Sequence, residues 1–162
     1  MKSQEINGLL VIQIPTGLET TSGYLFKLGK RAVSWSSKHQ PTVALSSCVA
    51  KYMAATQCVK EAIWLQGLLE EIGYPGKDKD NVQLFGDNMG ALALAQNPEY
   101  HARSKHIDVQ WHFVREKIQE EVVTLNYLPT DKMVADGLTK PLGKEKFKQF
   151  VDLMGMTTAG QA

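Results

Sequence analysis

The sequence has few features that would direct it to a membrane, to secretion or to a strongly charged partner. No apolar run approaches the roughly 18 residues that a membrane span requires, and the N-terminus lacks the pattern of a secretory leader. The formal net charge of the 162 residues is only +1. Attraction to a polyanion must therefore come from a local patch of basic side chains.

Cysteine is also scarce. Cys48 and Cys58 are the two cysteines, and they fall on one predicted helix. Ten helical residues span ~15 Å, which is too far for a disulfide. We therefore expect thiols in a reducing compartment, which predicts a cytoplasmic or nuclear location. A hydrophobic content of 43% and a charged content of 22% are typical of a soluble globular domain.

Hydrophobic patterning predicts three strands followed by a long helix in the first half of the chain. The strands are expected over residues 8–14, 23–28 and 31–36, and Gly29-Lys30 suits a tight hairpin between the last two. Ser46 or Ser47 can begin the helix, and Gly73 and Pro75 end it. Its apolar residues recur with helical spacing as a stripe formed by Ala54, Cys58, Ala62, Leu65, Leu69 and Ile72.

The second half predicts alternating strands and helices. Strands are expected at 82–85 and 122–128, with helices at 89–96 and 107–120. A C-terminal helical segment opens at Pro129, is interrupted near Pro141 and resumes at Lys144. The whole order predicts an α/β fold with a mixed five-stranded sheet and helices on its faces. We expect one domain over residues 1–156 and a frayed tail over 157–162.

Several short motifs recur in an order and spacing that resemble one known family. They are Thr21-Ser22-Gly23-Tyr24, Ser34-Trp35-Ser36-Ser37-Lys38, Glu61-Ala62-Ile63-Trp64-Leu65, Asp87-Asn88, His101-Ala102-Arg103-Ser104-Lys105-His106-Ile107-Asp108, Val134-Ala135-Asp136 and Leu138-Thr139-Lys140-Pro141-Leu142. Together they resemble the ribonuclease H domain of copia-type (Ty1/copia) retrotransposon polyproteins. The resemblance implies a ribonuclease H-like fold and a nuclease that cuts the RNA strand of an RNA–DNA hybrid with two divalent ions.

In this family four clustered carboxylates hold the two metal ions, and the resemblance carries over only two of them. Asp87 matches the third and Asp136 the fourth. Lys51 stands where the family has the second, the last glutamate of Glu-Ala-Glu-Tyr-Met-Ala. The first has no counterpart, because no aspartate occurs before Asp78 and Gln13 is the residue nearest the old position.

Half of the metal-binding set is thus absent, and the charge balance changes with it. Two carboxylates and one lysine sum to a single negative charge, which neutralises two Mg²⁺ ions poorly. The catalytic candidates Asp87 and Asp136 are therefore vestigial, and any Mg²⁺ or Mn²⁺ they bind is expected to be held weakly. We hypothesise that the Lys51 ammonium replaces a metal ion and pairs with one of these aspartates. The alternative is a solvated lysine in an exposed turn.

The basic connection before the predicted helix 107–120 is the main candidate for phosphate contacts, because backbone N–H groups and basic side chains meet there. The alternative is a solvated polar loop. The full set of candidate nucleic-acid-binding residues is Ser36, Ser37, Lys38, Asn88, His101, Arg103, Ser104, Lys105 and His106. Trp35, Trp64 and Trp111 are expected to pack against the core or lie half-buried rather than to stack on bases.

The sequence thus predicts a stand-alone, degenerate ribonuclease H-like domain captured by a host genome. We expect a pseudoenzyme that acts as a binding module, with no resident cofactor. Its partner would be an RNA–DNA hybrid or other nucleic acid, bound weakly, or a host protein. Two alternatives stay open: a purely protein-interacting domain, and residual ribonuclease H activity that depends on Mg²⁺ or Mn²⁺.

Overall fold

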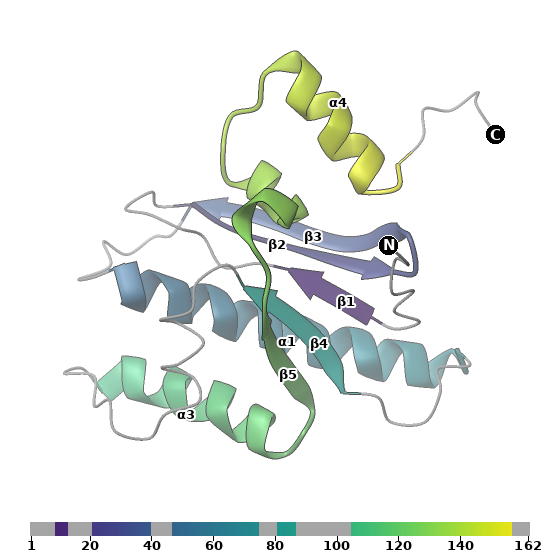
Figure 1. Ribbon diagram of the computed structural model, residues 1–162. Helices are drawn as coiled ribbons and strands as arrows, with labels where there is room; N and C mark the ends of the chain where they lie inside the picture. Colours follow the sequence, from purple (N-terminus) through teal and green to yellow (C-terminus); the bar gives the residue numbers. More distant parts are fainter. Residues whose placement is uncertain (1–8, 13–20, 40–46, 75–80, 87–104, 157–162) are drawn as a thin grey trace.

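A single mixed sheet organises the molecule (Figure 1). The computed structural model describes residues 9–12, 21–39, 47–74, 81–86 and 105–156. The strand order is β3-β2-β1-β4-β5, with β1–β2 and β2–β3 antiparallel and β1–β4 and β4–β5 parallel. The predicted mixed five-stranded α/β fold is confirmed. The strands are β1 (Leu9–Ile12), β2 (Thr21–Leu28), β3 (Arg31–His39), β4 (Val82–Gly86) and β5 (Val123–Tyr127).

The β2–β3 hairpin forms as the sequence predicts. Leu28 pairs with Arg31, and Gly29 between them has a φ of +61°, in the left-handed region that glycine adopts without a steric penalty. Both strands are longer than expected, because pairing continues beyond the apolar residues as far as Thr21 opposite His39. Hydrogen bonding therefore extends the hairpin past its hydrophobic pattern.

Two helices cover one face of the sheet (Figure 1). They are α1 (Ser47–Glu71) and α3 (Lys105–Gln119), which pack against each other. Buried side chains from both helices and from three strands form the main core between these layers. Its members are Phe26, Cys58, Val59, Ala62, Leu65, Val82, Leu84, Val114 and Val123.

The ends of α1 agree with the sequence prediction. The helix starts at Ser47, and Gly73 ends it with a φ of +65°. The amide of Gly73 donates to the carbonyl of Glu70 and that of Tyr74 to the carbonyl of Leu69, which is the Schellman arrangement. The predicted buried stripe is wrong at its last member, because Ile72 is 65% exposed.

The C-terminal segment lies over the other face of the sheet, above β2 and β3 (Figure 1). It contains two 3₁₀ helices, η1 (Thr130–Lys132) and η2 (Val134–Leu138), and then α4 (Lys144–Leu153). The predicted restart at Lys144 is confirmed. This face has its own core, formed by Leu25, Met133, Ala135 and Met154 with Phe85 and Phe150 packed against it.

Some expectations lie outside the described residues. These are the small helix at 89–96 and the tail at 157–162, so the division into one domain and a frayed tail stays a prediction. Of the helices within the described ranges, none is both long and apolar enough to cross a membrane.

The C-terminal end of α4 is tied to the β2–β3 hairpin. The amide of Ala32 donates to the carbonyl of Met154 at 2.8 Å, and Lys27 Nζ donates to the carbonyl of Leu153 at 2.8 Å. Gly155 follows with a φ of +70°, and a Cβ atom there would lie 2.2 Å from the carbonyl oxygen of Lys30. Only glycine fits this approach.

We therefore expect Gly155→Ala to lower the free energy of unfolding by about 2 kcal/mol or more, because a left-handed φ alone costs ~1–2 kcal/mol for a residue with a Cβ. Urea denaturation measures this. The control is Gly67→Ala in the interior of α1, where a Cβ would meet no neighbouring atom. It should instead raise stability by about 1 kcal/mol. Equal midpoints for the two variants would contradict the close approach at Gly155.

Candidate functional site

The carboxyl ends of β1 and β4 meet at one edge of the sheet. Ile12 lies opposite Phe85 in a parallel pair, so the chain leaves both strands at the same edge. Ligand sites in α/β sheets are found at such edges. Gln13 and Asp87, which follow these strands, lie outside the described residues. α1 begins at the same edge (Figure 1), with Lys51 in its second turn.

Close packing brings η2 to this edge. Leu25 of β2 pairs antiparallel with Ile12, so the start of β2 lies beside the end of β1. At Gly23 a Cβ atom would lie 3.0 Å from Thr139 Cγ2 and 3.1 Å from Leu138 Cβ. The absent side chain is what lets the C-terminal end of η2 rest on the strand.

Asp136 is thereby fixed beside the carboxyl ends of the strands. Its neighbour Ala135 is fully buried in the second core, which anchors η2 from below. The Thr139 hydroxyl donates to the carbonyl of Asp136 at 3.0 Å, and the Ser37 hydroxyl donates to the carbonyl of Leu138 at 2.7 Å. Of the two matched carboxylates, this is the one that the described residues include.

The Lys140 ammonium forms an ion pair with the Asp136 carboxylate. Lys140 Nζ lies 2.9 Å from Oδ1 and 2.9 Å from Oδ2. Only the contact with Oδ2 has the angles of a hydrogen bond. Oδ1 is buried and accepts no hydrogen bond from a described residue, although the ammonium is near.

Lys140 was missed as a site residue in the sequence, where it belongs to a basic group with Lys144, Lys146 and Lys148 that we expect to form an ordinary exposed face. Its spacing of four residues from Asp136 is the signal that could have identified it. The hypothesised partner Lys51 stays a prediction, because its side chain lies outside the described set.

Two Mg²⁺ ions would need several oxygen ligands near Asp136. Mg²⁺ prefers several oxygen ligands. The described residues contain no group of three or more His, Cys, Asp and Glu side chains that could hold a metal ion. They offer Asp136 alone at this edge, and an ammonium already lies against it. These residues do not fit a pair of Mg²⁺ ions.

The three candidates on β3 do not form one cluster. Side chains alternate along a strand, so Ser37 points to the η2 face, where its hydroxyl is bound to Leu138. Ser36 points to the α1 face and hydrogen-bonds with Tyr24, whereas Lys38 is exposed. The Ser37 hydroxyl already donates to the Leu138 carbonyl and Lys38 is exposed, so phosphate contacts from this strand stay a prediction.

Two of the remaining candidates lie at the start of α3. Lys105 and His106 are its first two residues, as the sequence predicts for a basic segment entering a helix. Their side chains are not described. Asn88, His101, Arg103 and Ser104 lie outside the described residues, so their part in a binding surface stays a prediction.

A polar cluster between β2, β3 and α1 was not anticipated from the sequence. The Ser34 hydroxyl donates to Glu61 Oε1 at 2.6 Å. Burial raises the pKa of the Tyr24 phenol above 10.0, and the negative charge of Glu61 raises it further, against a lowering hydrogen bond from Ser36. The cluster joins α1 to the hairpin through polar contacts beside the main core.

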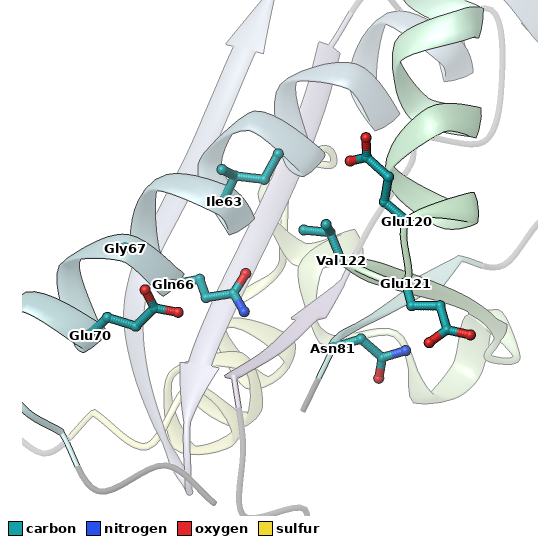
Figure 2. A pocket seen from close by; sticks show the side chains of 8 residues that line it. All are labelled: Ile63, Gln66, Gly67, Glu70, Asn81, Glu120, Glu121 and Val122. Carbon is teal, nitrogen blue, oxygen red and sulfur yellow. The ribbon is translucent and has the colours of Figure 1, made fainter. Parts of the chain in front are cut away.

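A pocket of about 650 Å³ opens at the opposite edge of the sheet, between α1 and the turn from α3 to β5. In Figure 2, Gln66 and Glu70 extend from α1 toward Asn81 and Val122. With Glu120 and Glu121 at the α3–β5 turn, the lining contains three carboxylates, which would repel phosphates. This pocket is therefore not a candidate for nucleic acid.

Comparisons with known proteins agree with the geometry. The chain is 41% identical over 138 residues to the retrovirus-related Pol polyprotein from transposon TNT 1-94 of Nicotiana tabacum, covering 85% of this chain and 10% of that protein. It is 36% identical to the corresponding polyprotein from transposon RE1 of Arabidopsis thaliana, covering 85% and 9%. No family model matches.

Solved structures show the same fold. One is LC11-RNase H1 in complex with an RNA/DNA hybrid, with a TM-score of 0.55, 16% identity, and coverage of 81% of this chain and 93% of that chain. Another is the N-terminal RNase H domain of a Mycobacterium tuberculosis protein, with a TM-score of 0.54, 10% identity, and coverage of 90% and 98%.

The chain is a homologue of copia-type retrotransposon Pol polyproteins. Its fold is that of ribonuclease H. The ribonuclease H-like chain spans about a tenth of the length of the curated relatives it matches. Lys140 belongs to the motif Leu138-Thr139-Lys140-Pro141-Leu142, and the structure adds its contact with Asp136.

Replacing Lys140 should change how Asp136 attracts cations. We expect Mn²⁺ to broaden the NMR amide signals of residues 134–139 at several-fold lower concentration in Lys140→Met than in the wild type, because the competing ammonium is gone. Lys144→Met is the matched control, since Lys144 is exposed and lies outside the ion pair. Equal broadening in all three proteins would show that Lys140 does not control access to the carboxylate.

Tyr24 should make stability depend on pH at the alkaline end. Because its pKa is raised in the folded state, the stabilisation is complete below pH 10 and is lost as the pH rises through the folded-state pKa. We expect the urea midpoint of the wild type to fall more steeply above pH 10 than that of Tyr24→Phe, which lacks the titrating hydroxyl. Parallel curves for the two proteins would contradict the assignment to Tyr24.

Proposed function

We propose that this ribonuclease H-like chain binds nucleic acid but does not carry out efficient two-metal cleavage. The observation that carries the proposal is Lys51 at the position of a metal-binding glutamate, together with the absence of aspartate before Asp78. The contact between Lys140 and Asp136 at 2.9 Å adds a positive charge beside a matched carboxylate.

The charge balance at the sheet edge favours binding over cleavage. A metal pair needs a concentration of negative charge, whereas the sequence supplies Asp87 and Asp136 with Lys51, and Lys140 adds a second positive charge. At an effective dielectric constant of about 20, two charges 4 Å apart interact by ~4 kcal/mol, so each reversal of sign matters. The four groups sum to zero net charge, so they do not supply the concentrated negative charge that a metal pair needs.

The partner best supported is an RNA–DNA hybrid. The solved structure of LC11-RNase H1 contains such a hybrid, and its fold matches this one. Lys38, exposed on β3, and Lys105, at the start of α3, come from the two segments that the sequence predicts for phosphate contacts. Such contacts are sequence-independent and weaken with salt.

The binding part of the proposal is tested by fluorescence anisotropy with a labelled RNA–DNA hybrid. We expect log K to fall with log salt at a slope of about −2 to −4, corresponding to a few phosphate contacts. Lys38→Glu and Lys105→Glu should each weaken binding. The control is Lys146→Glu, because Lys146 is exposed on α4 and should leave binding unchanged. Loss of affinity in all three variants alike would indicate non-specific attraction instead.

The same preparation tests cleavage. The wild type should leave the labelled hybrid intact in Mg²⁺ and in Mn²⁺. Cleavage that needs the metal and disappears in Asp136→Asn would overturn the pseudoenzyme proposal and favour residual ribonuclease H activity. Absence of both binding and cleavage by folded protein would instead favour a domain that interacts with proteins alone.

A further inference from the structure

α1 carries apolar side chains on its outer face as well as on its inner face. The inner residues, such as Ala62 and Leu65, are buried in the main core. On the outer side Trp64, Leu68 and Ile72 are exposed by 59%, 38% and 65%. They are spaced four residues apart, which places them in one row along the helix. We call Trp64, Leu68 and Ile72 the outer row.

Charged residues lie on either side of Trp64 and Leu68, two members of the outer row. Lys60 lies one turn before Trp64, and Glu71 lies just beyond Leu68 on the same side of the helix. Neither takes part in an ion pair with another described residue. Lys60 Nζ lies 5.9 Å from the centre of the Phe113 ring, near the outer limit of a cation–π contact. Both charges are therefore available to a partner.

This arrangement is complementary to itself when two helices run antiparallel. The pair Trp64 and Leu68 and the pair Lys60 and Glu71 are centred on the same point of α1, close to Gln66. A two-fold axis at that point would set Trp64 against Leu68 of a second copy. It would also set Lys60 against Glu71 of the second copy, twice over.

The geometry points to a second copy of this chain as the occupant of the outer row. Antiparallel pairing buries Trp64 and Leu68 and pairs both flanking charges, whereas a parallel pairing would oppose Lys60 to Lys60. A partner of unrelated sequence would have to present an acidic, two apolar and a basic residue in the opposite direction. A second copy of α1 presents them in that order when it runs antiparallel. One pair of helices buries less than a standard interface, so we expect a dissociation constant on the order of 10 µM. This inference is independent of the proposed function.

The test is sedimentation equilibrium of the full chain over a wide range of concentration. The wild type should form a dimer, and Trp64→Ala should shift dissociation to at least about tenfold higher concentration, because buried tryptophans dominate such interfaces. The matched control is Trp35→Ala. Trp35 is 50% exposed on β3 and, since Ser34 contacts Glu61 of α1, points to the opposite face of the sheet. The Trp35→Ala variant should therefore dimerise as the wild type does.

Charge reversal tests the antiparallel register without removing apolar surface. Lys60→Glu and Glu71→Lys should each raise the dissociation constant about tenfold, because each places like charges together twice. The double variant Lys60→Glu/Glu71→Lys should restore dimerisation. Circular dichroism checks that each variant is folded. A wild type that stays monomeric, or a double variant as weak as the single ones, would overturn the inference.

Discussion

The short strand β1 is the constraint on which the rest of the structure depends. Its four residues pair antiparallel with β2 on one side and parallel with β4 on the other. This change of direction within the sheet makes the ends of β1 and β4 and the start of β2 meet at one edge. α1 starts there, and η2 rests there on Gly23. Asp136 is far in sequence from the other elements at that edge. The directions of the strands, and not proximity along the chain, bring it there.

Local rules predicted the parts of the fold that local geometry decides. Gly29 and Gly73 adopt the left-handed φ that a tight hairpin and a helix end require, so the sequence marks both places. The buried face of α1 was less predictable. Apolar residues occur all round this helix, and periodicity alone cannot tell an inner residue such as Leu65 from an outer one such as Trp64.

The candidate site was predictable in its position but not in its contacts. The motif around Asp136 located the residue, whereas the ion pair with Lys140 depends on how η2 continues toward α4. Ser36 and Ser37, both candidates for phosphate contacts, point to opposite faces of β3 because neighbouring side chains alternate along a strand.

The two cores explain how this fold can persist when metal-binding carboxylates are replaced. The main core lies between the sheet and α1 with α3, and the second core lies under η2 and α4. Both are apolar, so neither depends on the charges at the sheet edge. Clustered carboxylates repel one another unless a cation is present. Lys140 beside Asp136 supplies that cation from within the chain. Stability and the shape of the edge can therefore be retained without bound metal.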